Sequence, residues 1–348
     1  MPKPLPLALA GTACISSSAV VMQLAGASAS LTAFARCAFA LPVLGALMIL
    51  ERRRPVPGYS PGALTSRGRW LARISGVFLA ADLIVWSHSI AAIGAGLGTV
   101  IPNLQVLVVA LLGWLVLGER PHRSLRIAAP FMLAGLALVG GLTGAHVYGA
   151  DPAAGVAEGA AVAVLYSLYI FILRQATASA GQPSPVAVLF EATLGAGVTS
   201  AVLGVVLRDF RLPADVWPAL GWLIMLALTS QVLGWLLITV SMARLPAWMV
   251  GVVLLVQPAG SVTLGYLVLG ERPAGIQLLG VGLMLAGVLV AVRGRTARGP
   301  AQELAPGASP LSGVAPAEHE DHPPGGGIIE GNVAVEVTIA SSDGEAAG

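Results

Sequence analysis

The stretch GWLVLGERP, residues 113–121, is followed 152 positions later by GYLVLGERP, residues 265–273. Eight of the nine positions are identical, and the same offset places MLAG at 132–135 over MLAG at 284–287 without a gap. A long internal period of this kind indicates a duplicated structural unit. Both copies are apolar over lengths that can cross a bilayer, so the sequence predicts a duplicated membrane protein rather than a soluble repeat protein.

The composition supports a membrane protein. Charged residues make up 10% of the chain and hydrophobic residues 56%. A soluble domain carries roughly 25% charged residues, so this chain lacks the charge to cover a soluble surface. Cys14 and Cys37 both fall in apolar segments. We expect them to be small buried side chains, with one disulfide between spans as the alternative.

Ten apolar runs of about 20 residues, the length of a membrane-spanning helix, divide the chain. The corner at 118–121 shows how they are separated: a glycine ends one helix, Glu and Arg reach the water interface, and a proline begins the next helix. We therefore predict an all-α membrane protein with ten transmembrane helices. The predicted spans are residues 6–24, 31–50, 71–93, 97–118, 124–143, 155–173, 185–207, 218–240, 247–269 and 275–292.

Lysine and arginine in the connections predict the orientation, because cytoplasmic loops carry an excess of both. With the N-terminus in the cytoplasm, 15 of these residues lie in inside segments and three in outside loops, and ten spans return the C-terminus to the cytoplasm. Five spans per copy is an odd number, so the second copy starts on the opposite side from the first. The sequence predicts two inverted repeats, residues 1–145 and 150–295. A disordered acidic tail, 299–348, follows, with eight acidic residues and no Lys or Arg.

These features resemble the EamA-type drug/metabolite transporter (DMT) superfamily over residues 6 to about 293. The resemblance is carried by the Gly-Glu-Arg-Pro corner in both halves and by FARCAFA at 34–40. It is carried also by DLIVWSHSI at 82–90, which leads to IPNL at 101–104. The resemblance implies ten helices around a central cavity, and the export or exchange of small metabolites.

Charged residues inside the spans are candidate transport residues. A charged side chain at the bilayer centre costs roughly 2.5–3.5 kcal/mol on insertion scales, so it needs a partner, a water-filled cavity or a function. Asp82 is expected to bind a cationic group or carry a coupling proton. The alternatives are hydrogen bonds to Asp82 from neighbouring helices or a static pair with Arg36, and we favour that pair over an anion-binding role for Arg36. Glu191 has no clear basic partner in its own half, which makes it a candidate proton carrier.

Two aromatic residues follow Asp82 on the same predicted helix. Trp86 lies one turn further on, so the two side chains share a face. A Trp beside a carboxylate can hold a cationic or aromatic substrate, with packing or lipid contact as the alternative. His88 falls on a different face and is a candidate proton site, because histidine titrates close to neutral pH.

The spans 97–118 and 247–269 are predicted to be cavity walls with hinges at Pro102 and Pro258. Proline interrupts the backbone hydrogen bonds of a helix, and such breaks are tolerated in membranes where they face protein or a cavity. Three amide side chains lie close to the prolines, and the alternative is that they only bond between helices. These amides are Asn103, Gln105 and Gln257, and further candidate wall residues are Gln23, Tyr166, Tyr169 and Gln231.

We hypothesise a secondary-active transporter that exports or exchanges small metabolites or drugs across the plasma membrane by alternating access, driven by protons or by exchange. The sequence contains no catalytic or nucleotide-binding motif, so no enzyme activity, cofactor or metal is expected. The expected partners are a small-molecule substrate, the lipid bilayer, protons and a second copy of the chain, but not nucleic acid. The alternatives are a non-transporting membrane scaffold, a lipid-modifying enzyme and a passive channel.

Overall fold

The structure is a computed structural model. The chain divides into two units, Met1–Gly313 and Val314–Gly348, and the described residues all belong to the first. The predicted acidic tail and residues 119–121 of the first corner lie outside the described residues. The structure describes residues 4–53, 64–118, 123–141, 147–178, 183–242, 245 and 247–296.

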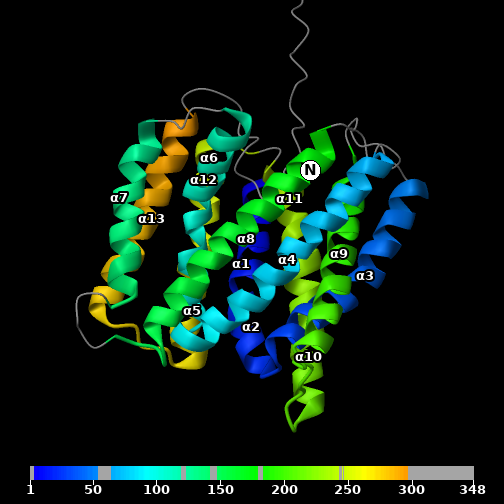
Figure 1. The fold of residues 1–348 in the computed structure, drawn as a ribbon, viewed down its shortest axis with the longest axis horizontal. Helices are drawn as coiled ribbons and strands as arrows, with labels where there is room; N and C mark the ends of the chain where they lie inside the picture. Colours follow the sequence, from blue (N-terminus) through cyan, green and yellow to red (C-terminus); the bar gives the residue numbers. More distant parts are fainter. Residues whose placement is uncertain are drawn as a thin grey trace, which may run out of the picture. The chain divides into compact units, whose positions relative to one another are not determined.

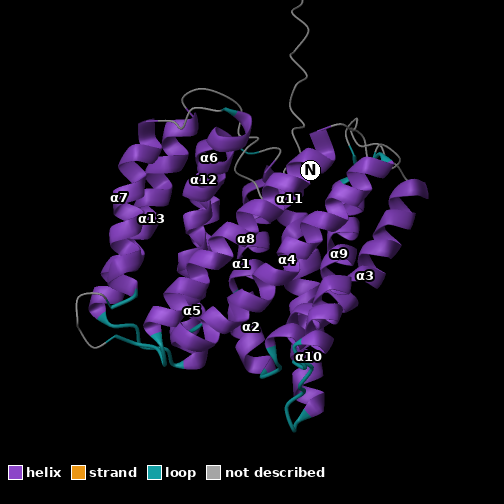
Figure 2. Cartoon of the chain, in the orientation of Figure 1, coloured by secondary structure: helices purple, strands orange, loops and turns teal. Residues whose placement is uncertain are grey.

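Within these ranges the regular elements are helices and no strand occurs (Figure 2), as the apolar runs of membrane-spanning length predict. They are named in Figure 1 in chain order, where η1 is a 3-10 helix and η2 a π-helix. Their bounds are α1 (Pro4–Ser16), α2 (Ser18–Ala25), α3 (Ala29–Arg53), α4 (Ser66–Ile93), α5 (Ala95–Val100), η1 (Ile101–Leu104), α6 (Gln105–Leu117), α7 (Arg123–Val139), α8 (Pro152–Ala178), α9 (Pro185–Val206), α10 (Val216–Leu226), η2 (Ala227–Gly234), α11 (Trp235–Met242), α12 (Ala247–Leu269) and α13 (Gly275–Thr296).

Eight helical stretches of the described chain are long and apolar enough to cross a membrane. The two other predicted spans correspond to α7, which has 17 described residues, and to α12, whose continuous stretch of described side chains is Leu255–Leu269. Large apolar side chains such as Leu115 and Val206 are 66% and 70% exposed. Large apolar side chains exposed to this extent suit contact with lipid rather than with water.

The offset of 152 residues recurs in the helix bounds. The starts of α5 and α12 are 152 positions apart, as are the starts of α7 and α13 and the ends of α6 and α12. Gly118 and Gly270, which follow those two ends, have φ angles of 70° and 68°. This left-handed conformation ends a helix, and glycine adopts it without strain. The duplication is therefore one of structure as well as sequence.

The repeat-related helices α7 and α13 pack side by side (Figure 1). Added Cβ atoms show where they meet: one at Gly135 would lie against Met284, and one at Gly287 against Met132. From one contact to the next, the residue numbers along α13 fall as those along α7 rise. The two helices therefore run antiparallel. The contacts are also reciprocal, because Met132 and Met284 occupy equivalent repeat positions, as do Gly135 and Gly287.

Candidate functional site

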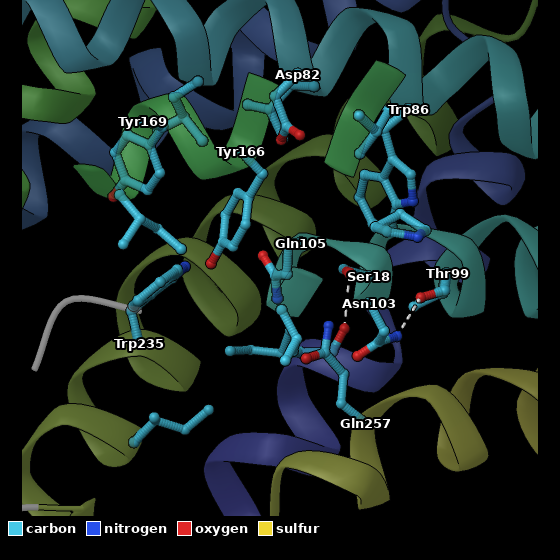
Figure 3. Close-up of a pocket in the computed structure, with 18 of the residues that line it drawn as sticks. Ser18, Asp82, Trp86, Thr99, Asn103, Gln105, Tyr166, Tyr169, Trp235 and Gln257 are labelled. Atoms are coloured by element: carbon cyan, nitrogen blue, oxygen red, sulfur yellow. Dashed lines mark hydrogen bonds between the residues drawn. The ribbon is translucent and has the colours of Figure 1, made fainter. Parts of the chain in front are cut away.

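A cavity of about 160 Å³ lies between helices of both halves of the chain (Figure 3). It has room for roughly ten water molecules. Irregular backbone contributes to its wall: Ser18 follows the α1–α2 break, Asn103 lies in η1, and Gln231 lies in η2. Irregular backbone within a membrane is tolerated where it lines a cavity, and π segments are frequent at functional sites. Seven of the predicted site residues line this cavity, namely Arg36, Asp82, Trp86, Pro102, Asn103, Gln105 and Gln257.

Asp82 is a buried carboxylate on the cavity wall. Its residue exposure is 5%, and the oxygen Oδ1 has no hydrogen-bond partner. Its carboxylate points into the space between Tyr166 and Trp86 (Figure 3). A buried charged group without its hydrogen bonds costs a few kcal/mol, so an atom of this kind marks a candidate ligand contact. The equivalent repeat position is Gly234, so the second half supplies no matching carboxylate.

The predicted pair between Arg36 and Asp82 is wrong. Arg36 on α3 is 6% exposed and donates from Nε to Gln231 Oε1 at 2.9 Å and from Nη2 to Ser230 Oγ at 3.1 Å. The ion pairs of the described residues do not include one between Arg36 and Asp82. Both accepting oxygens belong to the wide turn of η2. The guanidinium is therefore bonded to η2 rather than to Asp82. Both charges line one cavity without pairing.

The proline break in span 4 explains the contacts of Trp86 and Asn103. Pro102 has no N–H to donate to the carbonyl of Gly98, four residues earlier. Trp86 Nε1 donates to this carbonyl at 3.0 Å. Asn103 Nδ2 donates to the carbonyls of Thr99 at 3.2 Å and of the next residue at 2.8 Å. Both side chains therefore stabilise the broken backbone while they line the cavity.

The repeat-related amides Gln105 and Gln257 reach the same cavity from α6 and α12 (Figure 3). Gln105 Oε1 is buried and has no hydrogen-bond partner. The neighbouring prolines differ: Pro102 lies in η1, where the span is interrupted, whereas Pro258 lies inside the continuous α12. The break expected at Pro258 is absent from this helix, and a hinge there stays a prediction.

Aromatic side chains cover the wall near Asp82. The rings of Tyr166 and Tyr169 on α8 have centroids 5.6 Å apart, and Trp235 on α11 lines the cavity as well. Tyr166 and Tyr169 were predicted as wall residues, as was Gln231. Ser18, Thr99 and Trp235 also line the cavity but were not predicted, because these residue types occur at many positions in the spans and no motif distinguishes them. Gln23 does not line the cavity and donates to the carbonyl of Ile90 at 3.2 Å.

His88 and Glu191 also lie outside the cavity lining, as does Pro258. His88 is exposed near the end of α4. Glu191 has a basic partner in the other half of the chain, because Arg73 Nε of α4 lies 2.7 Å from Glu191 Oε2 of α9. Close packing makes this contact: a Cβ added at Gly195 would collide with the backbone of Arg73. A proton-carrying role for Glu191 stays a prediction.

The described residues include no group of three His, Cys, Asp or Glu side chains placed to hold a metal ion. Cys14 and Cys37 are both free thiols, so the disulfide considered as an alternative does not form. The polar groups that line the cavity are carboxylate, guanidinium, amide and hydroxyl groups, next to aromatic rings.

The second corner ties the two halves together at Glu271. This residue is 2% exposed, and its carboxylate accepts from the backbone N–H groups of Ala95 at 2.5 Å and Gly96 at 3.0 Å. These N–H groups begin α5 and have no partner within their helix. Burial, and then the negative charge of Glu271, raise the pKa of the nearby loop residue Tyr148. The corner sequence therefore has a specific contact beyond ending its own helix.

A second acidic residue joins the halves in the loop between α9 and α10. The Asp209 carboxylate accepts from the backbone N–H of Ser30 at 3.0 Å and from Arg211 Nη2 at 3.3 Å. The Asp209 carbonyl accepts from the Ser28 hydroxyl at 2.6 Å. Desolvation by burial acts to raise the pKa of Asp209, but the hydrogen bonds from Ser30 and the charge of Arg211 outweigh it and lower the pKa below its ordinary value.

Comparison with known proteins agrees with this fold. A structure described as "Crystal structure of protein" is similar to the chain with a TM-score of 0.54 and 18% identity, over 85% of this chain and 99% of that chain, which shows a shared fold. A search of curated proteins finds no significant match. The sequence model of the EamA-like transporter family matches residues 3–141 and 154–293, one match in each half. This confirms the predicted resemblance: the chain is a multi-pass membrane protein that belongs to the EamA-like transporter family.

Proposed function

We propose that this protein is a secondary-active transporter that moves small metabolites or drugs out of the cell. The observation that carries the proposal is the cavity between the two halves, whose wall includes buried atoms of Asp82 and Gln105 without hydrogen-bond partners. Polar atoms inside a membrane protein are retained where they meet water, an ion or a solute. Membership of a transporter family supports the same conclusion.

The proposed mechanism is alternating access between two inverted repeats, residues 1–145 and 150–295, that together supply ten spans. The antiparallel and reciprocal packing of α7 and α13 supports the inversion, because equivalent helices then lie about an approximate two-fold axis. Two halves related in this way can exchange conformations and open the cavity to each side in turn. The excess of Lys and Arg in the connections supports a cytoplasmic location for both termini in the plasma membrane.

Cysteine labelling tests the inversion. Single cysteines are introduced at Arg120 and at Arg272 in a variant with Cys14 and Cys37 replaced by alanine. An impermeant thiol reagent applied to intact cells should modify the Arg272 position, whereas the Arg120 position should react only after the membrane is opened. Modification of both positions from the same side would contradict inverted repeats.

Flux in proteoliposomes tests transport. The purified chain should show saturable uptake and counterflow of a solute that stabilises it against heat, and a passive channel would show neither. A pH gradient should change the flux if protons drive it, whereas a trans solute should change it if exchange does. Asp82→Asn should remove the response to the pH gradient in the first case. Deletion of residues 299–348 should leave the flux unchanged, since a scaffold would need that tail and a carrier does not.

A further inference from the structure

Several hydrogen-bond donors of the cavity wall are used within the protein, whereas two of its buried acceptors are not. Six lining side chains direct an N–H or O–H to an oxygen of the protein. The two buried atoms of the lining that have no partner, Asp82 Oδ1 and Gln105 Oε1, are both acceptors. A solute that satisfies these two atoms must bring donors. The six donating residues are Ser18, Arg36, Trp86, Thr99, Asn103 and Gln231.

The charge at Asp82 specifies the kind of donor. Its carboxylate is buried, and Arg36, the other buried charge on that wall, is hydrogen-bonded to η2 instead. A neutral hydroxyl would supply one hydrogen bond but would place no positive charge in contact with the carboxylate. A protonated nitrogen supplies both, and hydrogen bonds between charged groups are the stronger kind.

The surroundings of Asp82 suit a cation with an apolar body. Tyr166 and Trp86 flank its carboxylate, and Tyr169 and Trp235 extend the aromatic wall (Figure 3). Aromatic faces attract cations and offer apolar area to the rest of the molecule. The volume of about 160 Å³ limits the occupant to a small molecule.

We propose that the cavity binds a small protonated amine with an apolar or aromatic body, with its N–H donors directed to Asp82 and Gln105. This assignment rests on the proposed transport function and gives it a substrate class. The amine belongs either to a simple organic cation or to an amino acid. In the amino acid, the carboxylate would use N–H groups of Arg36 other than those bonded to Gln231 and Ser230.

Calorimetric titration of the full-length protein in detergent tests the assignment. Four probes share a phenyl ring and differ in their charge: 2-phenylethylamine, phenylalanine, neutral 2-phenylethanol and anionic 3-phenylpropanoate. The amine should bind at least tenfold more tightly than the alcohol, because its contact with Asp82 is charge-assisted. If phenylalanine binds more tightly than 2-phenylethylamine, the solute is an amino acid rather than a simple organic cation, and the assignment stands.

Two variants separate the role of Asp82 from that of buried acids in general. Asp82→Asn keeps the side-chain shape and should weaken amine binding roughly 10- to 100-fold while leaving the alcohol unchanged. Glu158→Gln on α8 is the matched control, because Glu158 Oε2 is also buried without a partner and the residue does not line the cavity. This control should bind the amine as the unmodified protein does.

Two outcomes would overturn the assignment: equal affinity of the unmodified protein for the amine and the alcohol, or preference for the anion. The first comparison needs no variant, so it holds even if Asp82→Asn fails to fold. Flux measurements distinguish this failure from failure of the transport proposal. Saturable flux of solutes that lack an amine, without amine binding, refutes only the substrate class. Amine binding without flux refutes transport and leaves the site.

Discussion

Glu271→Gln should loosen the contact between the second corner and the start of α5. The carboxylate accepts two backbone N–H groups, from Ala95 and Gly96, in a site where Glu271 is 2% exposed. A hydrogen bond to a charged group contributes about 1.5–3 kcal/mol. The glutamine keeps one neutral acceptor and turns an NH2 group toward the other N–H, so we expect a loss of about 1.5–3 kcal/mol at this contact.

Hydrogen–deuterium exchange of the backbone amides measures this loss locally. Opening of the contact should become roughly 10- to 100-fold more frequent, so Ala95 and Gly96 should exchange faster by that factor. Asp215→Asn is the matched control, since Asp215 precedes α10 and makes no side-chain hydrogen bond to that helix. Unchanged exchange at Ala95 and Gly96 in Glu271→Gln would refute the argument that the corner carboxylate holds α5.

Three further substitutions test other contacts. Gly280→Ala should destabilise the protein by about 1–3 kcal/mol in thermal unfolding, because the added methyl group meets the backbone of α7. The methyl group added by Gly282→Ala on the same helix meets nothing within 4 Å, so this control should stabilise the protein by up to about 1 kcal/mol. A double-mutant cycle of Arg73→Met and Glu191→Gln should give a coupling of about 1 kcal/mol, since the pair is partly exposed, and no coupling would contradict a stabilising ion pair. The lowered pKa of Asp209 stabilises the folded state above about pH 4, the ordinary value, and this stability is lost as the pH falls through the folded-state pKa. Melting temperatures between pH 6 and 3 should therefore fall more steeply in the unmodified protein than in Asp209→Asn, and parallel curves would contradict this.

The features that the sequence predicted well are local. Helix ends at Gly118 and Gly270 follow from the conformational freedom of glycine, and the apolar runs follow from the thickness of a bilayer. Asp82, Gln105 and Gln257 could be selected as cavity residues because polar side chains are rare in such runs. Each of these inferences needs only the residue and its neighbours in the chain.

The contacts that the sequence did not predict join distant positions. Arg73 and Glu191 are 118 positions apart, and they meet because α4 and α9 approach closely at glycines. Arg36 is bonded to η2, and no residue type in that segment signals a π-helix in advance. The contact of Glu271 with α5 likewise depends on how the second half packs against the first. Such partners require the tertiary structure.

The wall around Asp82 has a consequence for how this protein could diversify. Helix bounds next to the corners are shared by both halves, yet the position that carries the acid in the first half is Gly234, the last residue of η2, in the second. Substitutions that alter solute choice can therefore accumulate in one copy while the matching copy keeps its shape. Ancestral duplication would thus have supplied a framework in which selectivity and architecture evolve on separate residues.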